Sequence, residues 1–160
     1  MIKVSYIRQI ADHTCGPAAL AMLLKYWQKP GSQQQLIKQC HTTERSGTTR
    51  KNLIHAARAR GLYVHSHSQA SYAELRYLVQ HGIPVLVNFR ELEENIGHYG
   101  VVVEVSSQHL LIHDLYHGLA FKMFAKLFKQ RWHGTHYSVN RHWLLAVQPR
   151  PFSAKLHRFF

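Results

Sequence analysis

The residues that could do chemistry begin with Cys15, at the mouth of an apolar helical segment. Gly16 and Pro17 follow it, and proline is tolerated at a first helical position because that N–H has no intrahelical partner. A thiol there faces unpaired N–H groups and the positive end of the helix dipole, and both favour the nucleophilic thiolate. The stretch therefore predicts a cysteine nucleophile, with a small buried core cysteine as the alternative.

A thiol nucleophile needs a base, and the base needs an acceptor that orients it. His98 is the best base candidate, because it follows the loop 91–97 and opens a valine-rich strand. The next expected strand ends at His113 and Asp114, one antiparallel hairpin away, so Asp114 should lie at the same end of the sheet as His98. The chain has 14 histidines, so the alternative for His98 is an ordinary histidine at the end of a strand. The alternative for Asp114 is a turn residue, because aspartate is common where strands end.

Gln9 lies six residues before Cys15 and suggests a separate role. Its side-chain amide could donate to an oxyanion that forms at Cys15, together with a backbone N–H at the helix mouth. A donor of this kind is worth roughly 3–4 kcal/mol in acyl transfer. The alternative is an exposed polar glutamine, and the spacing alone does not decide between the two.

The elements that must position these residues fall into a helical half and a later strand-rich half. Apolar spacing and capping residues predict helices over 17–28, from Ser32 to 39, from Thr48 or Thr49 to about 60, and from Ser71 to about 81, with a short strand at 62–65. Strands are expected at 83–89, 98–105, 110–113 and 143–147, Gly118 in a turn, and a helix at 124–132. Helices followed by strands indicate an α+β fold, with the helical half on one face of an antiparallel sheet.

The composition indicates a globular chain with a basic surface. Its 160 residues suit one compact domain, which we expect to span residues 1–148, with a basic aromatic tail at 149–160. The formal net charge is +12, which favours acidic partners. The basic residues are scattered and no nucleic-acid motif is present, so we expect a solvated basic surface and no dedicated nucleic-acid site.

The sequence argues against a membrane or secreted protein, a disulfide-rich protein and a structural zinc protein. The apolar runs are too short to form a transmembrane segment, and no signal peptide is evident, so we expect a cytoplasmic protein. Two cysteines, Cys15 and Cys40, do not make a disulfide framework. No two paired Cys/His ligand sets stand at structural zinc spacing, so no metal is expected.

A set of short motifs follows in order along about residues 5–148: Gln9, Cys15-Gly-Pro-Ala-x-Leu20, Gly47-Thr48, Gly61-Leu62, Gly82-Ile-Pro-Val85, His98-Tyr-Gly-Val-Val102 and Asp114. This ordered set resembles the bacteriocin-processing peptidases that cut after a double glycine, a branch of the papain-like cysteine peptidases. The resemblance covers nearly the whole chain. It implies a papain-like fold with the N-terminal helices packed on a C-terminal antiparallel sheet.

The same resemblance implies roles for four residues. Cys15 would be the nucleophile, His98 the base, Asp114 the orienting residue and Gln9 part of the oxyanion hole. The substrate would be a leader or precursor peptide cleaved after Gly-Gly, with the leader bound as an amphipathic helix in a hydrophobic groove, and with no metal or organic cofactor. Such domains are usually fused to a membrane-spanning export transporter, and the 160 residues contain no such segment. We therefore expect a free-standing member, or a relative with a changed substrate, with an export transporter as a candidate partner.

Two other functions compete with this interpretation. A papain-like acyl transferase or deamidase would use the same Cys–His–Asp set on another amide. A non-catalytic peptide-binding module of the same fold is the third hypothesis, and the intact Gln9, Cys15, His98 and Asp114 argue against it. The sequence does not separate the first two, because groove shape selects water or an amine as the acyl acceptor.

Overall fold

The fold is built around one six-stranded sheet in which all neighbouring strands are antiparallel, in the order β1–β6–β2–β3–β4–β5. The computed structural model describes residues 1–134 and 141–159. Its strands are β1 (Tyr63–His67), β2 (Val85–Arg90), β3 (Gly97–Val105), β4 (His109–Asp114), β5 (Gly118–Phe124) and β6 (Leu144–Gln148). The expected α+β class and antiparallel sheet are confirmed.

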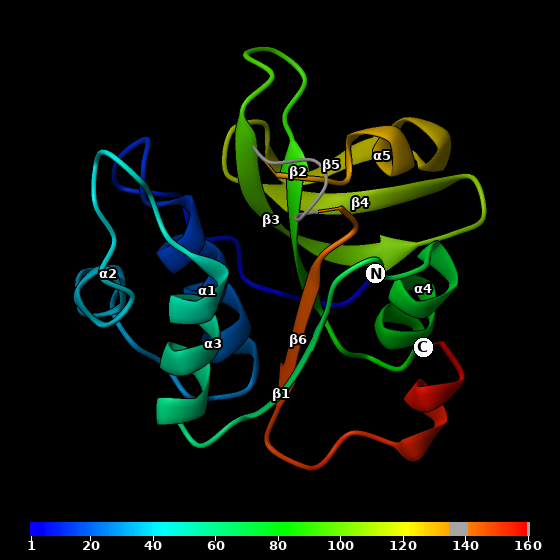
Figure 1. Ribbon diagram of the computed structural model, residues 1–160, viewed down its shortest axis with the longest axis horizontal. Helices are drawn as coiled ribbons and strands as arrows, with labels where there is room; N and C mark the ends of the chain where they lie inside the picture. The colour runs from blue at the N-terminus through cyan, green and yellow to red at the C-terminus, as the bar shows by residue number, and fades with distance from the viewer. Residues whose placement is uncertain (135–140, 160) are drawn as a thin grey trace.

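Helices cover both faces of this sheet (Figure 1). One face carries α1 (Cys15–Tyr26), α2 (Gln33–Gln39) and α3 (Arg50–Ala59). The other carries α4 (Tyr72–Gln80), α5 (Ala125–Arg131) and the 3₁₀ helix η1 (Ala154–Phe159). The chain therefore has two hydrophobic cores, one on each side of the sheet.

Helix α1 is the centre of the first core. Every residue from Gly16 to Leu24 is buried, and a helix that is apolar all round must be enclosed by other elements. The small side chains of Ala18, Ala19 and Ala21 let the helix axis lie close to its neighbours, and the helix packs on β3. This packing holds the N-terminus of α1, and hence Cys15, against the sheet.

Short polar residues begin three of the helices, as their sequence patterns predict. Ser32 forms a complete capping box before α2, and Thr49 rather than Thr48 caps α3. Ser71 accepts a hydrogen bond from the backbone N–H of Glu74 at 3.1 Å and so caps α4. The spacing of Ser71 and Glu74 has the form of a capping box, but the Glu74 side chain does not complete it, because it turns to two histidines of β1.

The structure differs from the sequence-based expectation in two elements. Strand β5 occupies 118–124, where only a turn was expected; it is an edge strand with a mostly half-exposed surface, so its hydrophobic pattern is weak. Helix α4 lies on the face opposite α1, whereas the helical half was expected on one face. Strand β1, which joins the edge of the sheet beside β6, carries the chain between the two faces.

The end of the chain packs against the second core. Leu156 of η1 is buried, and Phe159 lies 5.5 Å from the ring of Tyr77 on α4. The division of the chain at residue 148 stays a prediction. Among the described residues, no helix combines the length and apolar character needed to cross a membrane.

Candidate active site

Cys15 opens α1 and is partly exposed at a cleft. The residue after it must be small. A Cβ on Gly16 would lie 2.8 Å from the Cβ of Thr48, closer than side chains normally approach. Glycine therefore lets the mouth of α1 sit directly against the 46–49 loop, which forms a wall of the cleft.

His98 and Asp114 meet at the same end of the sheet, as the sequence predicts. His98 is the second residue of β3 and Asp114 the last of β4, and both are buried. The Nε2 of His98 and the Oδ1 of Asp114 are 2.9 Å apart. Gly100 pairs with Asp114, and a Cβ there would lie 2.8 Å from a methyl carbon of Ile112, so the two strands approach closely only with glycine.

The electrostatics of His98 link all three residues. Burial would lower the pKa of its imidazole, but hydrogen bonds with Asp114 and Cys15, together with charge attraction to both, raise it to about 9. Because Nε2 is used by Asp114, Nδ1 is the nitrogen left for the Cys15 thiol. A histidine with this pKa is protonated at neutral pH, which is the partner that a thiolate requires.

Asp114 is held as a carboxylate. Burial would raise its pKa, but hydrogen bonds from His98, Tyr116 and His117 keep the pKa below the ordinary value of 3.8. The backbone N–H of Tyr116 donates to Oδ1 at 2.8 Å, and His117 Nδ1 lies 2.8 Å from Oδ2. Both oxygens are thus engaged, and the carboxylate cannot rotate freely away from His98.

His113, the neighbour of Asp114, has a structural role. Its Nε2 donates to the carbonyl of Val4 at 2.8 Å, and its Nδ1 accepts from the N–H of Ala120 at 3.2 Å. This arrangement requires the neutral ring, and burial lowers the pKa of His113. Both ring nitrogens are thus occupied by backbone groups.

The loop that leads into His98 is tied down at its start. Glu91 is buried and accepts hydrogen bonds from the backbone N–H groups of Glu93 and Glu94. Arg131 of α5 donates to the backbone carbonyl oxygens of Arg90 and Glu91, at 2.8 and 2.6 Å. These bonds fix the path of the chain before β3 and hence the position of His98.

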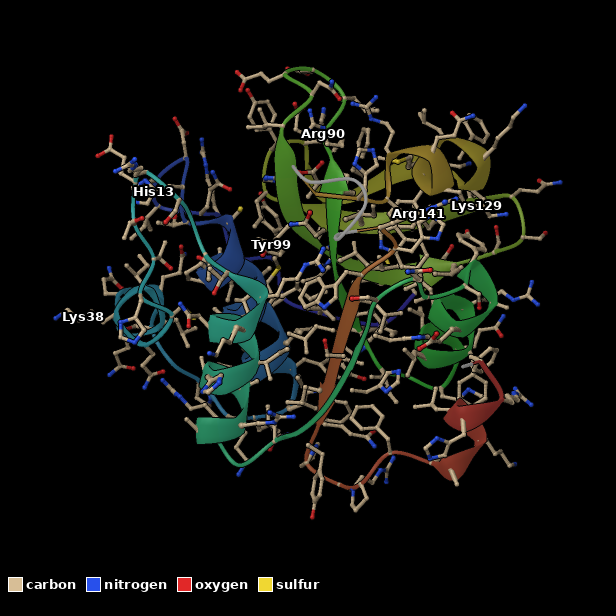
Figure 2. The ribbon with its side chains drawn as sticks, in the orientation of Figure 1. His13, Lys38, Arg90, Tyr99, Lys129 and Arg141 are labelled. Atoms are coloured by element: carbon tan, nitrogen blue, oxygen red, sulfur yellow. The ribbon has the colours of Figure 1, made fainter. Side chains whose placement is uncertain are left out.

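A cleft of about 630 Å³ extends from Cys15. Tyr99 projects from β3 toward the helices of the first core (Figure 2), and its hydroxyl donates to the carbonyl of Thr48 at 2.9 Å. Asn88 of β2 lines the same cleft. Its Oδ1 is buried with no hydrogen-bond partner among residues 1–134 and 141–159. The basic residues Arg50 and Lys51 also line this cleft.

Gln9 lines a second cavity together with Tyr116. The ring of Tyr116 contacts His98 edge-on at 6.3 Å, so this cavity lies beside the same imidazole. Gln33 of α2 holds the chain on both sides of Gln9: it donates to the carbonyl of Arg8 at 2.7 Å and accepts from the N–H of Ile10 at 3.3 Å. The role of Gln9 in an oxyanion hole stays a prediction.

Three neighbours of the site were not predicted from the sequence: Asn88, Tyr116 and His117. His117 carried a weak local signal, because a residue three positions after a strand-end aspartate can turn back to it. Asn88 could have been noticed as a polar residue that interrupts the apolar run of β2 before Arg90. Tyr116 gave no signal that distinguished it from other exposed tyrosines.

Comparisons with known proteins agree with this architecture. The model of the peptidase C39 family matches residues 3–142. PedD of Pediococcus acidilactici, a pediocin PA-1 transport/processing ATP-binding protein, is 32% identical over 112 residues, which are 68% of this chain and 14% of PedD. The chain thus matches a small part of that relative's length.

Two solved structures share the fold. The peptidase domain of Streptococcus ComA, a bifunctional ABC transporter involved in quorum sensing, has a TM-score of 0.74 and 23% identity, over 94% of this chain and 100% of that one. A double glycine motif protease from an AMS/PCAT transporter, solved with its leader peptide, has a TM-score of 0.74 and 24% identity, over 93% and 94%. With the family match over most of its length, this chain belongs to the peptidase C39 family of cysteine peptidases.

Proposed function

We propose that this peptidase cleaves a leader or precursor peptide after a Gly-Gly pair, with Cys15 as nucleophile and His98 as acid and base. The observation that carries the proposal is the chain of contacts from Cys15 through His98 to Asp114 at an open cleft. This arrangement has the order that covalent acyl transfer requires: a thiol, an imidazole, and a carboxylate that orients the imidazole.

In the proposed reaction, the Cys15 sulfur attacks the carbonyl carbon of the second glycine. The oxyanion is stabilised by the Gln9 side-chain amide and a backbone N–H at the start of α1. Protonated His98 gives its proton to the departing amine, which leaves the acyl group on Cys15. His98, now neutral, then takes a proton from the water that hydrolyses the thioester. Asp114 holds the ring in place through both steps.

The wall of the cleft beside Cys15 supports a requirement for glycine at the cleavage site of the substrate. Gly16 lies against Thr48, and the Tyr99 hydroxyl ties Thr48 to the sheet, so this wall cannot retreat easily. A substrate Cβ next to the scissile carbonyl would have to displace it. The positive charges of Arg50 and Lys51, which line the cleft, favour a substrate with an acidic segment there.

The relatives support the class of substrate. PedD is named for both processing and transport, and the AMS/PCAT protease was solved with a leader peptide. We infer that the substrate of this chain is a precursor peptide destined for export, and that a transporter is its partner in the cell.

The test is a series of synthetic precursor peptides measured for kcat/KM, with the products identified by mass spectrometry. Replacing either glycine by valine should lower kcat/KM by roughly 100-fold or more, because steric exclusion acts on the transition state. A glycine-to-valine change of the same size after the scissile bond is the control and should cost much less. Indifference to valine at both positions would contradict the double-glycine specificity.

The same products distinguish hydrolysis from acyl transfer. A free carboxylate on the N-terminal fragment indicates water as the acceptor. A fragment joined to an added amine would favour the acyl transferase hypothesis, and release of ammonia from a side-chain amide would favour a deamidase.

A further inference from the structure

A cluster of three metal-ligating side chains lies away from the active site. His65 and His67 project from β1, and Glu74 projects from α4. His65 Nε2 is 2.7 Å from one carboxylate oxygen of Glu74, and His67 Nδ1 is 2.6 Å from the other. The three ligand atoms all lie within 4.8 Å of one another. Two imidazoles and a carboxylate thus converge on one point between strand and helix.

Local structure brings the three together. Residues two apart on a strand share a face, so His65 and His67 point to the same side of β1. Glu74 is the third residue of α4, on the helix that covers this face. Val64, which precedes His65 and so points to the other side of the strand, packs with the opposite core, which is the core of α1. The cluster and Cys15 therefore belong to opposite faces of the sheet.

We propose that His65, His67 and Glu74 form a binding site for a divalent transition-metal ion, with Zn²⁺ as the best-suited ion. Two histidines and one glutamate are a donor set that zinc takes in proteins, with a water molecule as the fourth ligand. The proposal does not depend on the proposed peptidase function.

The distances suit a zinc ion after small side-chain movements. Zinc lies about 2.0–2.2 Å from nitrogen and oxygen ligands, which places tetrahedral ligand atoms roughly 3.3 Å apart. The nitrogen–oxygen distances of 2.7 and 2.6 Å would widen by roughly 0.6–0.7 Å to reach this separation, and the nitrogen–nitrogen distance, now at most 4.8 Å, would have to be about 3.3 Å. Rotations of the imidazole rings about their side-chain bonds supply movements of this size.

The surroundings also suit a metal ion. Glu74 is completely buried, and a carboxylate in that position gains from a cation close to it. The imidazoles of His65 and His67 are 11% and 22% exposed, which leaves a path from solvent. The ring of Phe152 lies 5.6 Å from that of His65, so the C-terminal segment forms an apolar wall beside the site.

The metal-free alternative is a buried carboxylate that accepts one N–H from each imidazole. This arrangement satisfies Glu74 without an ion, and it uses the same ring nitrogens that would bind zinc. A bound ion would replace the two hydrogen bonds that join β1 to α4 with metal–ligand bonds. The two hypotheses differ in a measurable way, because only a metal site takes up zinc with defined stoichiometry.

The experiment uses the tag-free full chain carrying Cys15→Ala, so that the thiol cannot bind zinc. Zinc uptake is measured by competition with a chromophoric chelator and by metal analysis after desalting, and unfolding is followed by circular dichroism. We expect one zinc per chain, a dissociation constant below about 10 μM and a raised Tm. If this protein does not bind zinc in that range, the proposal is wrong, and no variant of the three residues is needed to show it.

Variants then locate the site. Glu74→Gln keeps the volume of the side chain and one acceptor oxygen but removes the anionic ligand, and His67→Ala removes one imidazole. Each should weaken zinc binding by at least about tenfold and abolish the zinc-dependent rise in Tm. His55→Ala, at an exposed position on α3, is the matched control and should bind zinc as before. Equal zinc affinity in the Glu74 variant and the control would overturn the proposal.

Discussion

His98 and Asp114 are joined by a 2.9 Å hydrogen bond between Nε2 and Oδ1, and this bond determines which nitrogen of His98 faces Cys15. With Nε2 engaged, the ring presents Nδ1 to the thiol. The two other hydrogen bonds to Asp114, from Tyr116 and His117, hold the carboxylate in the position that orients the ring. A change at Asp114 should therefore alter both the position and the protonation of the His98 ring.

Removal of the carboxylate charge should shift the pH dependence of the enzyme. The raised pKa of His98 places its loss of a proton at about 9, so kcat/KM should fall as the pH rises through about 9. Asp114→Asn removes a negative partner, lowers the pKa of His98 and should move this alkaline limb to lower pH. It should also reduce kcat/KM, by less than His98→Ala does. An alkaline limb that stays in place would show that Asp114 does not control the protonation of His98.

The two cysteines should differ sharply in reactivity. Cys15 is partly exposed at the cleft, whereas Cys40 is fully buried and burial raises its pKa to about 11. Iodoacetamide at neutral pH should therefore label Cys15 much faster, as measured by peptide mass mapping. Cys15→Ala should remove this fast labelling and all turnover while the circular dichroism spectrum is kept. Equal labelling of the two thiols, or turnover in the variant, would exclude Cys15 as the nucleophile.

Asn88 should contribute to substrate binding through its unpartnered oxygen. A buried acceptor with no partner among the described residues is poised to receive an N–H from the substrate backbone. Losing one such bond costs about 1–3 kcal/mol, so Asn88→Ala should lower kcat/KM by roughly 5- to 150-fold. Asn52→Ala on α3 is the matched control, and its kcat/KM should be unchanged. Similar kinetics for both variants would mean that the Asn88 oxygen does not contact the substrate.

The contact between Gly16 and Thr48 should tolerate no added methyl group. Gly16→Ala would place a Cβ 2.8 Å from the Cβ of Thr48, which forces the 46–49 loop away from the mouth of α1. We expect a loss of about 1–3 kcal/mol in the free energy of unfolding, measured with urea, and lower activity. Adding Thr48→Gly removes the atom that clashes, so the double variant should recover part of the activity. If the double variant is less active than Gly16→Ala, the contact is not the cause.

The local pattern of the chain was enough to predict most of the elements and the proximity of His98 to Asp114. The helix that begins at Cys15 follows from Gly16 and Pro17 and the apolar run behind them, because capping and periodicity are short-range properties. His98 and Asp114 could be paired in advance because they lie on consecutive strands, and a hairpin brings such residues to the same end of a sheet. The capping of α2 by Ser32 was predictable for the same short-range reason.

Long-range packing decided the rest. The contact between Cys15 and His98 depends on how α1 docks on β3, and the strand order that inserts β6 between β1 and β2 is not written in any local pattern. Helix α4 packs on the face opposite α1, and there the Glu74 side chain contacts His65 and His67 of β1 instead of the start of its own helix. Glu74 meets these histidines because the packing of α4 beside β1 brings a competing polar group to its carboxylate, and the buried contact, shielded from water, is the stronger one.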